Sequence, residues 1–523
     1  MVQEVGELVP EIIQDSELPA RLLKIDRQQI KTFSKLVHTK SLDGQTRKDL
    51  CSSGYATLSY CWGASQPLTL QSATVATLEQ GVDIDHLPKT LRDSILVTAE
   101  VGLNYIWIDA LCIFQDDDLD KKVEIARMPL YYGRNTLTIS AASSTKCTDG
   151  VLSETSAENC FRAGPFELSF STAAGAGTVQ LYQLAPRPPE PIDLRGWTFQ
   201  ESVLSRRVLI FASDQLHWCC NFGKASCGGP SAALTEQDNI AWDRDQTYTM
   251  NQFGQLTLDS WSDMVQSYTT RKVTVESDKL LAISALADRV VEVLRSSWPS
   301  ITYVSGLLVI PDQIWSWIDQ LIWLPRPGSA RRASTYRAPS WSWACLEFDQ
   351  SLEDLRVLIP RGHNVRGFDI SFAVRDFFVD LSLPSAPFGS VRSAHLLVSG
   401  YMKSLSAEPA VEVAFPDSRT PVLRLQLHRP ASNKLFLFPD TINDKELMRK
   451  ALAGAESVFL LEVIPPKLSI QRSYPTAGLA IVESATDVFR RIGVFAFFAT
   501  CDESGAATLD DYFDLGFRDV KLV

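Results

Sequence analysis

The sequence of 523 residues lacks the features that mark several large classes of protein. Its ten cysteines include no CxxC pair and no framework spacing, so we expect reduced thiols in cores. The net charge is −12 and no basic run is longer than Arg331–Arg332, which argues against a nucleic-acid partner. No stretch approaches the roughly 18 apolar residues of a membrane span, and the N-terminus lacks a signal-peptide pattern. We therefore predict a cytoplasmic protein with no membrane span.

Three widespread ligand-binding motifs are also missing. The chain has no G-x-G-x-x-G, no G-x-x-x-x-G-K-[ST] and no G-x-S-x-G, which removes the Rossmann-type dinucleotide, P-loop and α/β-hydrolase interpretations. The Gly-rich stretch Ala173–Thr178 lies between two strand-like runs and predicts a hairpin loop. Three acidic residues at Asp116–Asp118 lack the alternating spacing of a calcium loop and predict a helix N-cap. We predict no metal and no resident cofactor.

The composition indicates a globular protein of more than one domain. Hydrophobic residues make up 45% and charged residues 21%, and the chain is too long for a single ordinary core. The first 50 residues are polar, with one expected helix near Arg27–Val37. The segment Pro325–Ala338, rich in Pro, Gly, Ser and Arg, is the strongest boundary signal. We expect four parts: an N-terminal extension (1–50), an α/β domain (51–220), a helical section (221–335) and a β-rich domain (340–523).

Alternating strand and helix patterns in the second part predict an open, mainly parallel sheet with flanking helices. Unbroken apolar runs indicate buried strands, and apolar residues at helical spacing indicate the helices between them. The expected strands are Tyr55–Cys61, Tyr105–Phe114 and Asn135–Ala142, and the expected helices are Leu91–Gly102 and Asp118–Tyr132. Further along we expect a helix at Arg195–Leu204, paired strands within Arg207–Cys220, and middle helices at Ser260–Thr270, Asp278–Leu294 and Asp312–Leu324.

Two places carry candidate site residues. Asp109 stands near the carboxyl end of an apolar strand, where ligands gather in α/β sheets, although a buried capping or paired aspartate explains it equally well. In Arg195–Glu201, the arginine could grip a phosphate or carboxylate and Trp197 could stack on a ring. The alternative is an Arg–Glu strut that joins subdomains. Cys112 is interpreted as a small core residue.

Three blocks of sequence carry a family resemblance. They are YATLSYCWG (Tyr55–Gly63), YIWIDALCIFQDDDLDKKVEIARMPLYYGRNTLTISAA (Tyr105–Ala142) and RGWTFQESVLSRRVLIF (Arg195–Phe211). In this order and spacing they resemble the fungal HET (heterokaryon incompatibility) domain. The resemblance implies a role in allorecognition and programmed cell death.

The HET domain is in turn similar to TIR domains, some of which hydrolyse NAD through a helix glutamate. This similarity implies Glu124 as a catalytic carboxylate and NAD as a possible substrate rather than a cofactor. Glu124, Met128 and Tyr132 share one helical face by their spacing, and a carboxylate is what an oxocarbenium-like transition state requires. The catalytic candidates are therefore Glu124, Asp109 and Glu201, and the expected substrate-binding residues are Tyr60, Trp62, Cys112, Gln115, Arg195, Trp197 and Gln200.

Three functions remain open at this point. The first is a cell-death effector that hydrolyses NAD-like dinucleotides. The second is a non-enzymatic module that acts by self-assembly, as a homo-oligomer or with a partner HET protein. The third is an enzyme of fungal secondary metabolism that rearranges or cyclises a small molecule. Departures from the family pattern at Phe114 and Cys219 keep this third possibility open.

Overall fold

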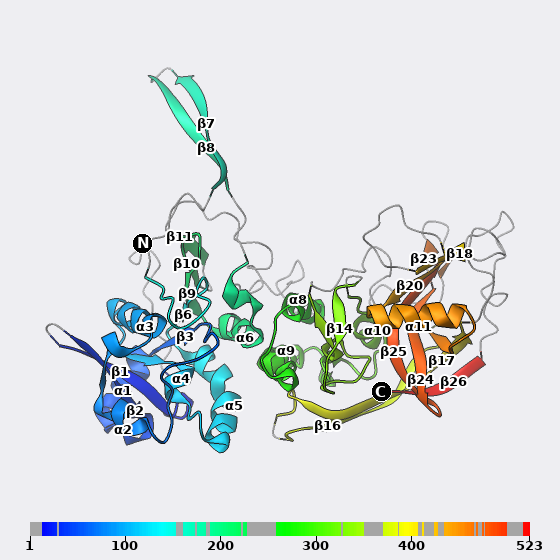
Figure 1. Cartoon of the computed structure of the whole chain (residues 1–523), viewed down its shortest axis with the longest axis horizontal. Coiled ribbons are helices and arrows are strands. Elements are labelled where there is room, and N and C mark those ends of the chain that lie inside the picture. The colour runs from blue at the N-terminus through cyan, green and yellow to red at the C-terminus, as the bar shows by residue number, and fades with distance from the viewer. Residues whose placement is uncertain are drawn as a thin grey trace. The chain divides into compact units, whose positions relative to one another are not determined.

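The structure is a computed structural model that forms two compact units, Met1–Tyr248 and Thr249–Val523, which are described separately (Figure 1). The four-part division expected from the sequence stays a prediction. The structure describes residues 13–28, 31–152, 161–172, 175–184, 189–220, 223–226, 258–325, 328–349, 370–384, 386–405, 411–412, 423–426, 434–464, 467–468, 473–474, 476–498 and 516–523.

The first unit is built around one mixed nine-stranded sheet. Its four central strands, β9, β6, β3 and β5, run parallel, and antiparallel strands flank them on both sides. In order of pairing the strands are β11 (Gly223–Ser226), β10 (Leu216–Cys220), β9 (Arg207–Phe211), β6 (Leu137–Ser140), β3 (Ala56–Ser59), β5 (Tyr105–Trp107), β1 (Arg21–Arg27), β2 (Thr32–His38) and β4 (Val82–Asp83).

Helices cover this sheet, which confirms the predicted α/β class. Helix α3 contacts β3 and β5, and helix α6 contacts β3 and helix α5. Helix α5 begins where predicted because the Asp117 carboxylate accepts hydrogen bonds from the backbone N–H groups of Leu119 and Asp120. The helices of the unit are α1 (Gly44–Ser53), α2 (Val75–Gln80), α3 (Lys89–Glu100), α4 (Asp109–Cys112), α5 (Asp118–Arg134) and α6 (Gly196–Leu204).

The strand predicted at Tyr105–Phe114 is wrong over its second half. Strand β5 ends at Trp107, and Asp109–Cys112 forms the short helix α4. Every residue from Ile108 to Ile113 except Asp109 is buried, so an unbroken apolar run is equally compatible with a buried strand or a buried helical turn. The turn places the Asp109 side chain at its first position, directly after the strand.

The helix predicted near Arg27–Val37 is also wrong. This stretch belongs to the antiparallel pair β1 and β2, which joins the sheet through β5. The alternation of buried and exposed side chains along Leu23–Asp26 is that of a strand with one face on the core. Residues counted as an extension from the sequence therefore complete the sheet.

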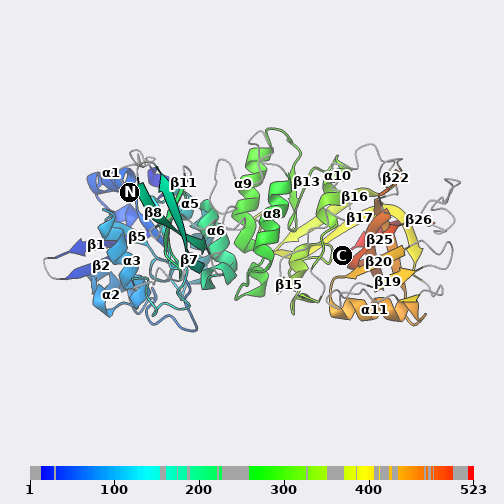
Figure 2. The same cartoon turned by 90° about the horizontal axis from the view of Figure 1, so that it is seen from above.

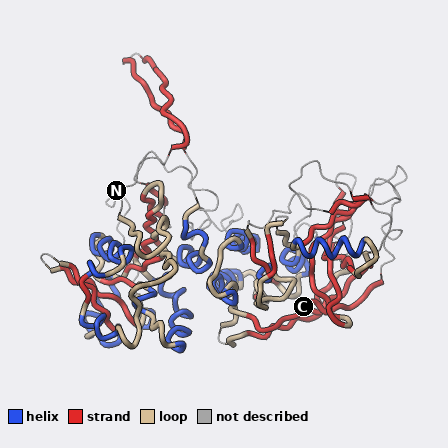
Figure 3. Tube along the Cα trace, in the orientation of Figure 1, coloured by secondary structure: helices blue, strands red, loops and turns tan. Residues whose placement is uncertain are grey.

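The predicted hairpin is confirmed, although Gly175–Thr178, predicted as part of its loop, belongs to a strand. Strands β7 (Phe161–Thr172) and β8 (Gly175–Leu184) pair antiparallel and form a sheet of their own (Figure 3). Four apolar side chains on the hairpin are at least 45% exposed: Phe166, Leu168, Phe170 and Val179.

The second unit contains the predicted middle helices and a β-rich part. The pairings from β17 through β21, β24, β25 and β26 return to β17, so these five strands form a closed ring. Helix α11 lies against β20 and β21 (Figure 2).

The helices of the second unit are α8 (Leu258–Thr269), α9 (Ser284–Leu294), α10 (Ile314–Leu321) and α11 (Ile442–Leu452). The main sheet contains β16 (Ala373–Leu381), β17 (Val391–Ser404), β18 (Val411–Glu412), β19 (Leu423–Gln426), β20 (Lys434–Pro439), β21 (Val458–Ile464), β24 (Thr476–Ala485), β25 (Val488–Phe498) and β26 (Gly516–Leu522). Two-stranded sheets are formed by β12 (Thr302–Val304) with β13 (Leu307–Val309), β14 (Ala330–Arg332) with β15 (Leu346–Phe348), and β22 (Lys467–Leu468) with β23 (Ser473–Tyr474).

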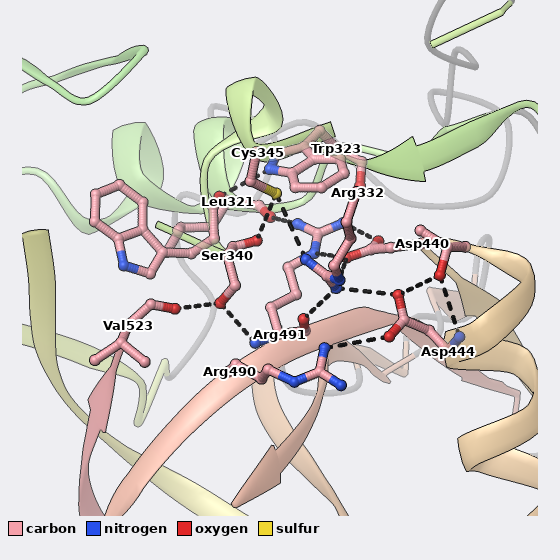
Figure 4. Close-up of polar contacts among 12 residues, drawn as sticks. Leu321, Trp323, Arg332, Ser340, Cys345, Asp440, Asp444, Arg490, Arg491 and Val523 are labelled. Atoms are coloured by element: carbon pink, nitrogen blue, oxygen red, sulfur yellow. Dashed lines mark hydrogen bonds and ion pairs between the residues drawn. The ribbon is translucent and has the colours of Figure 1, made fainter. Parts of the chain in front are cut away.

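A buried ionic cluster ties the end of helix α10 to strand β25 (Figure 4). The guanidinium of Arg491 is fully buried and binds both carboxylate oxygens of Asp440, at 3.1 and 3.0 Å. It also donates to the carbonyls of Leu321 and Trp323, at 2.6 and 2.5 Å, and stacks on the Trp323 ring. Arg332, which is partly exposed, pairs with Asp444.

Candidate functional site

The candidate site lies at the carboxyl ends of β3 and β5, which are neighbouring parallel strands. The chain continues from β3 into Tyr60, Cys61 and Trp62, and from β5 through Ile108 into Asp109. Carboxyl ends of adjacent parallel strands meet at one edge of a sheet, where α/β proteins bind ligands. This edge therefore brings the first two sequence blocks together.

Asp109 is held in a fixed orientation. The indole Nε1 of Trp62 donates to both of its carboxylate oxygens, at 2.9 and 3.2 Å, and the backbone N–H of Ala110 donates at 2.7 Å. Burial raises the pKa of Asp109, against the effect of the Arg195 charge and of these hydrogen bonds, which favour the ionised form. The residue is only partly exposed. A carboxylate that accepts three hydrogen bonds from two donors, Trp62 and Ala110, is suited to stabilise a cationic group.

Glu201 lies behind this edge, on helix α6. It is buried, and its Oε2 atom is 2.5 Å from the hydroxyl oxygen of Ser59, the last residue of β3. Burial and, to a smaller extent, the negative charge of Asp109 raise the pKa of Glu201 to about 7. The hydrogen bond from Ser59 and the charge of Arg195 act in the opposite direction.

Arg195 joins the third sequence block to the first. It caps helix α6, and its Nη1 donates to the carbonyl of Tyr60 at 2.5 Å. Its positive charge lowers the pKa values of both Asp109 and Glu201. Arg195 and Glu201 thus both contact residues at the carboxyl end of β3, namely Tyr60 and Ser59. The strut and the ligand-binding interpretations both fit this placement.

Two glutamines of the site have buried acceptor atoms that lack partners. Gln66 donates from Nε2 to the hydroxyl of Tyr60 at 3.1 Å, and its own Oε1 has no partner within the described residues. The Oε1 of Gln200, on α6, is also buried and without a partner in the described part of the chain. A buried acceptor without a donor is costly, so either atom could receive a hydrogen bond from a ligand or a water molecule. Trp197, also on α6, is half-buried.

Glu124 stands apart from this cluster. It is buried on α5, together with Met128 and Tyr132 of the same face. Its carboxylate accepts a hydrogen bond from the hydroxyl of Tyr131 at 3.0 Å. Burial raises the pKa of Glu124, and the positive charge of Arg21 opposes this. The contacts of Glu124 are thus with Tyr131 of its own helix and, through charge, with Arg21 on β1.

Cys112 and Gln115 have mainly structural contacts. The Cys112 thiol is fully buried, and burial raises its pKa to about 12, so it is no nucleophile at neutral pH. Gln115 donates from Nε2 to the carbonyl of Ile113 at 3.0 Å, which closes the turn after α4. Asp116 accepts from the backbone N–H of Ser72, and no group of three potential metal ligands is found within the described ranges.

Reasoning from the sequence missed Ser59 and Gln66 as members of the site. Ser59 is a polar side chain at the end of an apolar strand, beside the predicted Tyr60, and this position was a usable signal. Gln66 lies in a loop without regular structure, and nothing in its local pattern distinguishes it.

Comparison with known proteins gives one match. The family model described as heterokaryon incompatibility protein (HET) matches residues 55–201, the stretch that contains the whole cluster. No curated protein and no solved structure matches the chain. Among the described residues, no helix is long and apolar enough to cross a membrane.

Proposed function

We propose that this chain, whose residues 55–201 match the model of the heterokaryon incompatibility (HET) family, is a cytoplasmic cell-death effector that hydrolyses NAD-like dinucleotides. The observation that carries the proposal is the partly exposed carboxylate of Asp109, which is fixed by hydrogen bonds from Trp62 and Ala110 and whose pKa is lowered by the charge of Arg195 against the effect of burial. The reaction adds water across the bond between the ribose and nicotinamide, and yields ADP-ribose, nicotinamide and a proton.

The charges of the cluster match this chemistry. Cleavage of a glycosidic bond passes through a cationic ribose, which a nearby carboxylate stabilises. Asp109 supplies that charge, and Arg195 holds a phosphate group of the dinucleotide, for which a guanidinium is well shaped. Trp62 or Trp197 offers a ring on which a base can stack. The unpartnered amide oxygens of Gln66 and Gln200 accept donors from the substrate.

The test is incubation of the purified full-length protein with NAD and chromatographic measurement of nicotinamide and ADP-ribose. Asp109→Asn keeps the shape but removes the charge, and we expect turnover to fall by roughly 10²–10³-fold. Asp116→Asn is the matched control, because this aspartate is exposed and bonds only the Ser72 loop. Full activity in Asp109→Asn would refute the assignment, and intact NAD with the wild type would refute the function.

Glu124 remains the other candidate for the catalytic carboxylate, by its similarity to the glutamate of TIR domains. Glu124→Gln is expected to retain turnover, because its neighbours are Tyr131 and Arg21 rather than the Asp109 cluster. Lost turnover with an unchanged melting temperature would transfer the catalytic role from Asp109 to Glu124.

A second function, a self-assembly module, is favoured by the β7–β8 hairpin. Its exposed Phe166, Leu168 and Phe170 recur at every second position of β7, as on one side of a strand. Replacing all three by serine should then convert an oligomer into a monomer in light scattering, without changing NAD turnover. A wild-type protein that is monomeric at all concentrations would exclude this alternative.

A further inference from the structure

A lysine packs directly against the loop that leads away from the candidate site. The stem of Lys146, which follows strand β6 in the chain, lies on Gly63, the residue after Trp62. A Cβ atom on Gly63 would be 2.5 Å from the Cβ, 3.2 Å from the Cα and 3.8 Å from the Cγ of Lys146. Gly63 also has a φ of +80°. A glycine is therefore required here both for the backbone conformation and for the close approach of the lysine.

Hydrogen bonds of the main chain hold Lys146 in this place. The backbone N–H of Cys147 donates to the carbonyl of Trp62 at 3.3 Å, and the backbone N–H of Thr90 donates to the carbonyl of Cys147 at 2.8 Å. The carbonyl of Lys146 itself accepts from the Thr90 hydroxyl at 3.3 Å. The lysine is thus fixed next to Trp62, whose indole donates to the carboxylate of Asp109.

The ammonium group of Lys146 is weakly engaged. Within the described ranges its one ion pair is with Asp149, at an N–O distance of 3.9 Å, and the lysine side chain is 59% exposed. Such an exposed pair contributes little. The other oxygen of Asp149, Oδ2, accepts from the backbone N–H and hydroxyl of Thr145 and from the backbone N–H of Lys146. The charge of Lys146 is therefore free to bind an anion from solvent.

The loop under Lys146 offers hydrogen-bond donors for the same anion. Gly63, Ala64 and Ser65 are exposed, and the backbone N–H groups of Ala64 and Ser65 donate to no described residue. The Cys147 thiol donates to the carbonyl of Ser65 at 3.7 Å, which ties the loop to the lysine segment. Free backbone N–H groups beside a lysine are the donors with which many loops bind phosphate.

We propose that Lys146 and the loop Gly63–Ser65 form a phosphate-binding subsite next to Trp62 and Asp109. The chain has a net charge of −12 and Asp109 adds a carboxylate at the site, so a phosphate bound here needs a local cation. The identity of the ligand rests on the proposed function, in which Arg195 holds one phosphate of a dinucleotide. Lys146 then holds a further phosphate, either the second one of the diphosphate or a 2′-phosphate on the adenosine ribose.

The subsite is measured without turnover, by calorimetric titration of the full chain with ADP-ribose, 2′-phospho-ADP-ribose and adenosine. Lys146→Met keeps the apolar stem and loses the charge. We expect Kd to rise about tenfold for each probe that carries the bound phosphate, and to stay unchanged for adenosine, which has none. An equal rise for both phosphorylated probes assigns the subsite to the diphosphate. A rise confined to 2′-phospho-ADP-ribose assigns it to the 2′-phosphate.

Two variants serve as controls. Lys89→Met removes a lysine from the same region, where its Nζ is already engaged by the carbonyl of Asp149 at 3.2 Å. We expect this variant to keep Kd within about twofold of the wild type. Lys146→Arg retains a positive charge at the subsite and should keep Kd within about threefold. In the wild type, the affinity for the phosphorylated probe should also fall as salt screens the charge of Lys146, and the affinity for adenosine should not.

The outcomes separate the subsite from the proposed function. The subsite is overturned if the wild type binds neither phosphorylated probe, or if Lys146→Met binds both as well as the wild type does. A loss that Lys89→Met, Lys146→Arg or the adenosine titration shares also overturns it. NAD turnover with the same KM in Lys146→Met and wild type supports the function and rejects the subsite. Phosphate binding that depends on Lys146, without NAD turnover, supports the subsite and rejects the function.

Discussion

The fully buried Arg491 offers the sharpest test of what holds the second unit together. In Arg491→Met the side chain keeps much of its length but loses its charge and its donors. Asp440 then loses both of its hydrogen bonds to the guanidinium, and Arg332, at 3.8 Å, becomes its nearest remaining cation. The carbonyls of Leu321 and Trp323 lose their donors in the same step.

The expected loss of stability is large. Breaking a buried ion pair by removing one partner costs about 3–5 kcal/mol, because the remaining charge is buried without compensation. The two orphaned carbonyls place the value towards the upper end of that range. A domain is stable by only about 5–15 kcal/mol, and each kcal/mol shifts the melting temperature of a unit of this size by about 2–4 °C. We therefore expect the melting temperature to fall by roughly 10 °C.

The assay is thermal and urea unfolding of the full chain, followed by tryptophan fluorescence, because Trp323 stacks on the Arg491 guanidinium. Arg490→Met is the matched control. The Arg490 side chain is 32% exposed and pairs with Asp444 at 3.2 Å, so its loss should cost at most about 1 kcal/mol. Adding Asp440→Leu to Arg491→Met removes the uncompensated charge and should recover part of the stability.

The pH dependence of the stability loss in Arg491→Met tests whether the charge left on Asp440 causes that loss. Burial raises the pKa of Asp440, and the charges of Arg491 and Arg332 oppose this. Without Arg491 the folded chain binds a proton on Asp440 at higher pH, so the loss of stability should shrink as the pH falls. Equal stability of Arg491→Met and wild type at neutral pH, or a loss that grows on acidification, would refute the reasoning.

Two further substitutions test single features of the fold. Burial lowers the pKa of Lys279 to about 7, so the wild type should gain stability as the pH rises from 7 towards 10.5. In Lys279→Met this gain should be smaller, by at most about 5 kcal/mol in the free energy of unfolding measured in urea. A variant with the same pH profile as the wild type would contradict the burial argument. Gly54 has a φ of +75°, and a Cβ there would lie 1.9 Å from Thr136 Oγ1. Gly54→Ala should therefore lower the free energy of unfolding by about 1–3 kcal/mol. A melting temperature equal to that of the wild type would show that the backbone relaxes freely.

The sheet could be predicted from the sequence where the apolar pattern fits only one kind of element. It could not be predicted where a strand and a helical turn would bury the same residues. The central strands at Ala56–Ser59 and Leu137–Ser140 and the helices between them follow from unbroken apolar runs and helical spacing. The turn at Asp109–Cys112 could not be separated from a strand, because its side chains are buried in either form. Along Leu23–Asp26 apolar and charged residues alternate, which is typical of the strand that the structure shows there.

Part of the candidate site was also predictable from the sequence. Asp109, Arg195 and Glu201 stand at element ends, and the topology of parallel strands brings such ends together. The position of Glu124 depends on the rotation of α5 about its own axis, which spacing alone does not reveal. The sequence shows that Glu124 and Tyr132 share a face, but not which neighbouring element that face meets.

The segment between β6 and α6 returns to the place where β6 ends, because the backbone N–H of Ile192 donates to the carbonyl of Ala142 at 3.4 Å. Cys147 and Val151 still pack in the core of the unit, so the loop that contains the β7–β8 hairpin begins after Val151. Doubling the length of such a loop adds only about 0.6 kcal/mol of closure entropy. Evolution can therefore lengthen, shorten or replace the insert that contains the β7–β8 hairpin while Arg195 and Glu201 keep their distance from Asp109.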